Sequence, residues 1–153
     1  MTTSRHVTYD PRSLPFARRF AARIAGLCGH LLAHIAPVHL HRFLSIARTR
    51  AKPATVEEAS QAWTDVITAN IACDGPQACL TRSLATVVLC RFRGVWPTWV
   101  VGVRRSPPFG AHAWIEVEGM PVGESYPAGY HVPLVSVPPL GRRCHGRSPS
   151  PRS

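Results

Sequence analysis

The fold of this chain is decided by two short stretches, Cys79-Leu80-Thr81-Arg82-Ser83-Leu84-Ala85 and Ala111-His112-Ala113-Trp114-Ile115-Glu116-Val117-Glu118-Gly119. The first begins a predicted helix and the second begins a predicted strand. A thiol in the first turn of a helix feels the partial positive charge of unpaired amides, which lowers its pKa. An imidazole facing that thiol can accept a proton and return it. Cys79 and His112 are therefore candidates for the nucleophile and the acid–base group of an acyl-transfer site.

Up to residue 93 the apolar residues follow a helical period, which predicts helices over residues 14–36, 39–49, 55–71 and 77–93. In the first helix, one stripe of large side chains is expected to face the core: Phe16, Phe20, Ile24, Leu27, Leu31 and Ile35. The third helix has Thr55 as its expected N-cap, with Glu58 three residues later, as in a capping box.

From residue 95 onward the apolar residues alternate, which predicts strands over residues 95–103, 113–117 and 120–126. Glu118-Gly119 is expected to form a two-residue turn. The chain after residue 127 is rich in proline and glycine, and no strand is expected there. Helices followed by a small antiparallel sheet define an α+β fold. Three regions are expected: a helical part at 1–50, a core at 51–140 and a basic, Ser/Pro-rich disordered tail at 141–153.

The composition limits the partners that this chain can have. Its 153 residues carry a formal net charge of +10, and Lys52 is the only lysine. Because the arginines are spread out and form no compact basic helix, specific nucleic-acid binding is not expected. The most apolar stretch, residues 24–40, is interrupted by Pro37 and too short to span a bilayer, so stable membrane insertion is not expected either.

The cysteine and histidine usage bears on compartment and metal. Five cysteines with no preceding signal peptide make a disulfide framework unexpected and favour a reducing cytoplasm. No cysteine pair has zinc-finger spacing, and His30 and His34 form an i, i+4 pair with no third ligand evident. Neither a metal nor another cofactor is therefore expected.

A catalytic histidine needs an acceptor for its second ring nitrogen. Glu116 shares a strand face with His112 but lies about 13 Å away at the usual strand rise. If Glu118-Gly119 is a two-residue turn, Glu124 becomes a cross-strand neighbour of His112. Glu124 is therefore the predicted orienting group. Each residue also has a plainer interpretation: Cys79 as a core thiol, His112 as a structural histidine, Glu124 as a solvated carboxylate at the sheet edge.

The two stretches, together with Val101-Gly102-Val103 and the continuation Met120-Pro121-Val122, resemble the lasso peptide B2 proteins, which are transglutaminase-like cysteine leader peptidases. The similarity covers about residues 55–126. It implies a papain/transglutaminase-like fold and a Cys-His-Asp triad. Cys79 and His112 match that triad, and Glu124 stands in the third position in place of Asp.

The resemblance further implies that the protein hydrolyses a ribosomally made precursor peptide between leader and core, through a thioester on Cys79. A separate ATP-dependent lasso cyclase would then use the freed amine. Residues 1–50 do not resemble the leader-binding module that many relatives carry, so a separate leader-binding B1 protein is expected as partner. Three residues are expected to line the oxyanion or substrate site: Gln77, Arg82 and Trp114.

Two other functions are compatible with the same stretches. A transglutaminase-type acyl transferase would resolve the same thioester with an amine. A non-catalytic scaffold would dock the precursor, the leader binder and the cyclase without using the cysteine. A basic DNA-binding module is a more distant alternative.

Overall fold

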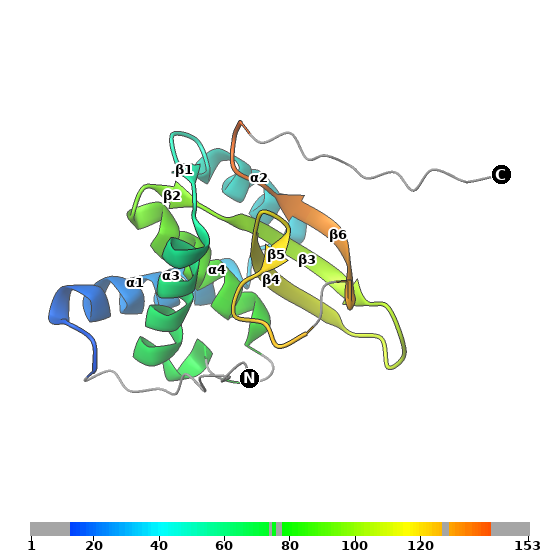
Figure 1. The fold of residues 1–153 in the computed structure, drawn as a ribbon, viewed down its shortest axis with the longest axis horizontal. Coiled ribbons are helices and arrows are strands. Elements are labelled where there is room, and N and C mark those ends of the chain that lie inside the picture. The colour runs from blue at the N-terminus through cyan, green and yellow to red at the C-terminus, as the bar shows by residue number, and fades with distance from the viewer. Residues whose placement is uncertain (1–12, 74, 76–77, 127–128, 142–153) are drawn as a thin grey trace.

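The computed structural model describes residues 13–73, 75, 78–126 and 129–141. Four α-helices and a short 3₁₀ helix lie beside a curved sheet, and the predicted α+β fold is confirmed (Figure 1). The helices are α1 (Phe16–Leu32), α2 (Pro37–Ala47), α3 (Val56–Ala69), η2 (Ile71–Cys73) and α4 (Cys79–Phe92). The strands are β1 (Lys52–Pro53), β2 (Val95–Trp96), β3 (Thr98–Arg104), β4 (Ala111–Val117), β5 (Met120–Pro121) and β6 (His131–Val137).

Helix α1 packs with the face opposite to the predicted one, so the prediction for its large apolar side chains is wrong. Its buried residues are Ala22, Ala25, Gly26, Gly29 and Leu32. The six residues of the predicted core stripe are exposed, from 38% for Ile24 to 74% for Phe16. Small residues allow close approach: a Cβ on Gly29 would lie 2.7 Å from the backbone nitrogen of Ala85 in α4. The face of α1 with small residues packs against α4 because it allows close contact between the two helices, and the larger side chains stay exposed.

Helix α3 begins as the sequence predicts. The Thr55 hydroxyl accepts the Glu58 N–H at 3.2 Å, and the Glu58 carboxylate accepts the Thr55 N–H at 2.9 Å, which completes the capping box. Further along α3, the fully buried Asp65 accepts hydrogen bonds from Arg18 of α1 and from Arg93 at the end of α4. This shared carboxylate joins α1, α3 and the end of α4.

The main sheet has the strand order β5-β4-β3-β6, and its pairs are antiparallel. Strand β6 falls in the segment where no strand was expected. Its Pro133 is compatible with pairing because β6 is an edge strand, where a missing N–H can face away from the ladder. A second, parallel pair joins β1, which was not predicted as a strand, to β2 at the start of the predicted strand 95–103.

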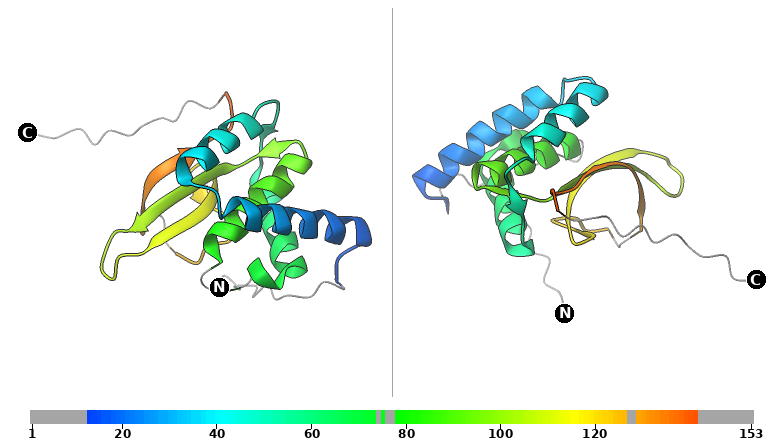
Figure 2. Two further views of the ribbon diagram at one scale, coloured as in Figure 1. Left: turned by 180° about the vertical axis from the view of Figure 1, so that it is seen from behind. Right: turned by 90° about the horizontal axis from the view of Figure 1, so that it is seen from above.

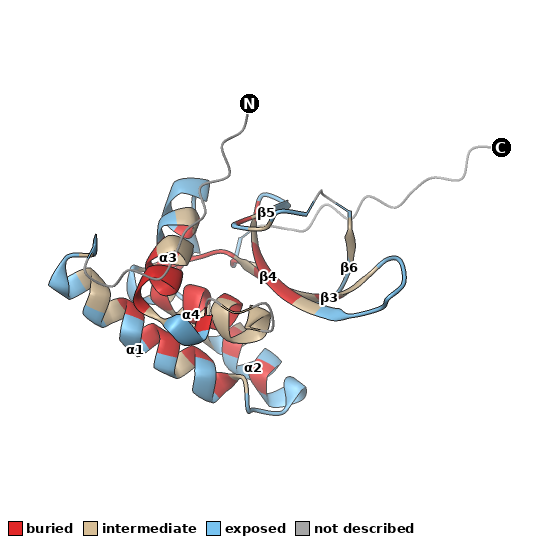
Figure 3. Ribbon diagram, turned by 90° about the horizontal axis from the view of Figure 1, so that it is seen from below, coloured by how far each residue is buried: buried red, intermediate tan, exposed pale blue. Residues whose placement is uncertain are grey.

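Strand alternation gives the main sheet two different faces. Val101, Ala113 and Val135 lie in register on the face toward the helices, whereas Gly102 and His112 are paired on the other face. The sheet curls around this second face, as the view from above shows (Figure 2). Buried residues concentrate where the helices meet the sheet, and the far rim of the sheet is exposed (Figure 3).

The turn after β4 has the predicted form. Val117 pairs with Met120, and Glu118 and Gly119 both have positive φ, at 55° and 80°. Strand β5 ends at Pro121 rather than at residue 126, although the Val122 N–H still donates to the Ile115 carbonyl at 3.0 Å. This continued pairing brings Glu124 back alongside the start of β4.

Two further sequence-based predictions concern the whole chain. Among the described helices, none has the length and apolarity needed to cross a bilayer. The region boundaries at residues 50 and 140 stay predictions, and residues 142–153 of the predicted tail lie outside the described residues.

One cluster of buried apolar residues extends from Ala22 of α1 to Val137 of β6.

Candidate active site

Cys79 is the first residue of α4, as the sequence predicted for a thiol in the first helical turn. No side chain caps this helix start, so its first amides are available to other acceptors. One of them, the Leu80 N–H, hydrogen-bonds to the Cys79 sulfur. The beginning of α4 therefore directs positive partial charge at the thiol.

Strand β4 brings His112 to the same place. Ala113 of β4 donates its backbone N–H to the Cys79 sulfur, so the helix start lies against the edge of this strand. Toward His112 this edge carries no strand in the described part of the chain, because the pairs of β5 with β4 lie at Glu116 and Val117 and the Val122 N–H bonds to Ile115, all further along β4. The His112 side chain, next to Ala113, hydrogen-bonds to the same sulfur.

The Cys79–His112 contact shifts both groups toward their charged forms. The pKa of Cys79 is lowered from 9.0, first by the His112 hydrogen bond and then by the Ala113 and Leu80 amides, against an opposing effect of burial. The pKa of His112 is raised from 6.5 to about 9 by its hydrogen bonds to Cys79 and Glu124. Both shifts favour the thiolate and the imidazolium, and the thiolate is the form that attacks carbonyl carbon.

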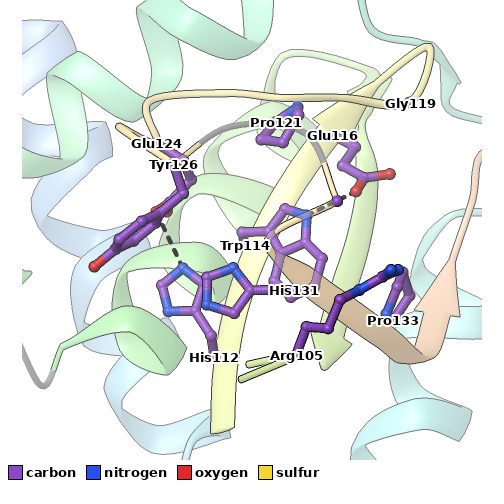
Figure 4. A pocket seen from close by; sticks show the side chains of 11 residues that line it. Arg105, His112, Trp114, Glu116, Gly119, Pro121, Glu124, Tyr126, His131 and Pro133 are labelled. Atoms are coloured by element: carbon purple, nitrogen blue, oxygen red, sulfur yellow. Dashed lines mark hydrogen bonds and ion pairs between the residues drawn. The ribbon is translucent and has the colours of Figure 1, made fainter. Parts of the chain in front are cut away.

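Glu124 lies where the turn geometry placed it. Its Oε2 is 3.0 Å from Nε2 of His112, and the two side chains are 10% and 14% exposed. Because Glu124 engages Nε2, the other ring nitrogen, Nδ1, is the one left to face the thiol. Figure 4 shows the contact as a dashed line between the two side chains. Cys79, His112 and Glu124 thus form one hydrogen-bonded chain.

A cavity of about 210 Å³ opens beside His112 on the concave face of the sheet. Trp114, buried to 5% exposure, stacks on His112 with ring centroids 5.7 Å apart, and its Nε1 donates to Glu116 at 2.7 Å. His131 of β6 also stacks on His112, at 4.6 Å, and its ring centroid lies 5.4 Å from that of Trp114. These rings hold the imidazole in a fixed plane (Figure 4).

His131 and Tyr126 are site residues that the sequence analysis missed. Both line the cavity, and Tyr126 contacts the His112 ring edge-on at 6.0 Å. The pKa of His131 is lowered, first by burial and then by the positive charge of His112. His131 was missed because its segment was assigned to loop. The β-branched residues Val132, Val135 and Val137 were the available indication of a strand.

The three residues predicted for the oxyanion or substrate site do not lie together at the Cys79 sulfur in the described part of the structure. Gln77 lies outside the described residues. Arg82 donates to the Cys73 carbonyl at 3.3 Å and lines a small hollow together with Glu124, next to the site rather than at the sulfur. Trp114 packs beneath His112. The structure brings Cys79, His112 and Glu124 together, and the amides of Leu80 and Ala113 are the hydrogen-bond donors at the sulfur.

Two other cysteines, Cys73 and Cys90, are buried in the hydrophobic core. Burial raises the pKa of Cys73 to about 11 and that of Cys90 to about 12. Across the described ranges, no three His, Cys, Asp or Glu side chains gather into a group that could hold a metal ion. The exposed His30 and His34 rings contact each other at 4.9 Å without further ligands from this set.

The sequence matches the transglutaminase-like superfamily over residues 24–135, and the chain belongs to that family. The matched range includes α4, β4 and the three residues of the hydrogen-bonded chain. No curated protein and no solved structure matches the chain. A cysteine enzyme that acts through an acyl-thioester is the class that this family and this geometry fit.

Proposed function

We propose that this protein is a cysteine leader peptidase that cleaves a lasso precursor peptide between leader and core. The observation that carries the proposal is the hydrogen-bonded chain from the Cys79 sulfur through His112 to Glu124. The resemblance of residues 55–126 to lasso peptide B2 proteins supplies the substrate class. The family match supports the thiol chemistry at the coarser level of transglutaminase-like enzymes.

In the proposed reaction, the Cys79 thiolate attacks the carbonyl carbon of the last leader residue. Amides at the start of α4 stabilise the resulting oxyanion. The His112 imidazolium protonates the departing amine of the core, and a thioester on Cys79 remains. His112 then takes a proton from water, whose oxygen attacks the thioester and releases the leader as a carboxylic acid. Glu124 keeps the His112 ring oriented in both steps and stabilises its protonated form.

We propose a separate leader-binding B1 protein as partner, with the ATP-dependent lasso cyclase acting after cleavage in the cytoplasm. The charge distribution supports an acidic partner or leader. The sequence has no Asp or Glu from residue 11 to residue 56, and Arg23, Arg42 and Arg50 are exposed. Affinity for the partner and the precursor should therefore fall as salt rises, whereas salt-insensitive binding would contradict this docking mode.

The function is tested by mass spectrometry of a lasso precursor encoded near the gene for this protein, incubated with this protein and the leader-binding partner. Wild type is compared with Cys79→Ala. We expect one cut at the leader–core junction, made without ATP and lost in the variant. Cutting that survives Cys79→Ala would contradict the assignment of the nucleophile.

The same experiment separates the two other functions. Products whose mass includes an added amine would assign the protein as an acyl transferase. An uncut precursor that nevertheless binds the protein and its partner would favour a non-catalytic scaffold. Each of these outcomes contradicts the peptidase proposal in a different way.

A further inference from the structure

A large apolar groove lies between α2 and the face of the sheet that points toward the helices. Its volume is about 610 Å³, within the range of about 300–1,000 Å³ that is typical of ligand pockets. Nine of its eleven lining residues are apolar, and six of these nine come from four different elements, α2, α4, β3 and β6: Val38, Leu40, Leu80, Trp99, Val101 and Val135. A groove of this size has room for more than one side chain.

The groove begins one residue away from the candidate nucleophile. Leu80, which lines it, directly follows Cys79 and donates its N–H to the sulfur. Val101, which also lines it, pairs with Ala113, the other amide donor to that sulfur. A peptide whose carbonyl reaches Cys79 can therefore continue directly into the groove.

The position of His112 decides which half of a peptide would enter. His112 lies on the opposite sheet face from Val101 and Val135, and it protonates the departing amine in the proposed reaction. The amine side of the scissile bond must therefore lie toward His112 and the concave face. The acyl side, which stays attached to Cys79, is left to extend along the helix-facing side, where the groove lies.

The chemistry of the groove indicates what that segment contains. Its floor is apolar, and its described lining residues carry Arg42 and His41 but no carboxylate. Burial of apolar surface would supply most of the affinity. An acidic residue near the apolar ones would be favoured by the Arg42 charge.

We propose that this groove binds the acyl-side segment of the peptide substrate through apolar side chains, with an acidic residue close to Arg42. This inference rests on the proposed function, because it assumes that Cys79 attacks a peptide carbonyl. It identifies the groove as the main determinant of sequence preference on that side of the cleavage site.

The test uses peptidyl acyloxymethyl ketones, which alkylate an active-site thiol after binding as the acyl side of a substrate. A series carries Leu or Gly at each of the three positions before the ketone, and each rate is divided by the iodoacetamide rate of the same protein. We expect Leu to accelerate Cys79 alkylation by about 10-fold over Gly at one position or more. Val38→Glu and Val135→Glu should reduce this preference to less than about 3-fold.

Ile46→Glu is the matched control, because Ile46 is 70% exposed on the same helix as Val38 and does not line the groove. Its preference should equal that of wild type. A wild-type protein without any preference, or an unchanged preference in both groove variants, overturns the proposal for the groove alone. If iodoacetamide does not modify Cys79 ahead of the other cysteines in wild type, the proposed function fails and this inference fails with it.

Discussion

The two ends of α4 hold cysteines in opposite environments. Cys79, at the start of the helix, is half-buried against the edge of β4 and receives hydrogen bonds from His112 and two backbone amides, so its pKa is lowered. Cys90, in the last turn, is 0% exposed in the core, and burial raises its pKa to about 12. One helix therefore carries a thiol whose pKa is lowered and another whose pKa is raised.

The difference shows that the surroundings of a cysteine, rather than its presence on an apolar helix, determine its reactivity. At the first turn, unpaired amides and an imidazole stabilise negative charge. Eleven residues later, the amides are paired within the helix and apolar neighbours exclude water.

The largest change in cleavage rate is expected from removing the Cys79 thiol, with removal of the Cys90 thiol as the comparison. Cys79→Ala should lower the rate of precursor cleavage by at least about 1,000-fold, because no nucleophile remains. Cys90→Ala should keep the wild-type rate, since it only leaves a small cavity in the core. Cleavage rates by mass spectrometry, with circular dichroism to confirm folding, would show this. Equal losses in the two variants would mean that the helix start has no special role.

A smaller loss of cleavage rate is expected from Glu124→Gln. The Glu124 charge helps to raise the pKa of His112 to about 9, so His112 stays protonated below that pH and the ion pair with Cys79 persists. Activity should therefore fall on the alkaline side near pH 9. Without the carboxylate charge, the pKa of His112 falls, and the alkaline limb should move to lower pH. The rate at neutral pH should drop by about 10-fold or more.

The control for this pH profile is Glu118→Gln, which neutralises an exposed carboxylate in the turn between β4 and β5. Its profile of cleavage rate against pH should match that of wild type. An alkaline limb that stays in place in Glu124→Gln would mean that Glu124 does not control the protonation of His112.

The smallest effect on reactivity is expected from the buried side of α4. Gly29→Ala places a Cβ 2.7 Å from the Ala85 nitrogen and 2.8 Å from the Thr81 carbonyl oxygen, so α1 must shift. The free energy of unfolding should fall by about 1–3 kcal/mol. Alkylation of Cys79 should be unchanged while the protein stays folded. The comparison is Leu31→Ala on the exposed face of α1, which should cost less than about 0.5 kcal/mol in denaturant unfolding.

Local patterns in the sequence predicted part of this structure well. The capping box at Thr55, the turn at Glu118-Gly119 and the start of α4 each depend on residues within a few positions of one another. The placement of Glu124 beside His112 followed from that turn, because a two-residue turn fixes the register of the strands that it joins.

Features that depend on distant parts of the chain were not predicted. The large side chains of α1 indicated a core-facing stripe, but the small residues on the opposite face fit the surface of α4 more closely. Strand β6 was missed because proline disfavours strands in general and is tolerated at an edge, and its edge position is a property of the whole sheet. His131 was missed for the same reason.

Alkylation kinetics test whether His112 holds Cys79 as a reactive thiolate. The folded protein is treated with iodoacetamide at pH 7, and each cysteine is followed by peptide mapping in wild type and in His112→Ala. We predict that Cys79 reacts at least about 100-fold faster than Cys73 and Cys90, since only the thiolate reacts, and that His112→Ala removes most of this advantage. Equal rates at Cys79 in the two proteins, or a rate at Cys79 no higher than at the buried cysteines, would contradict the account.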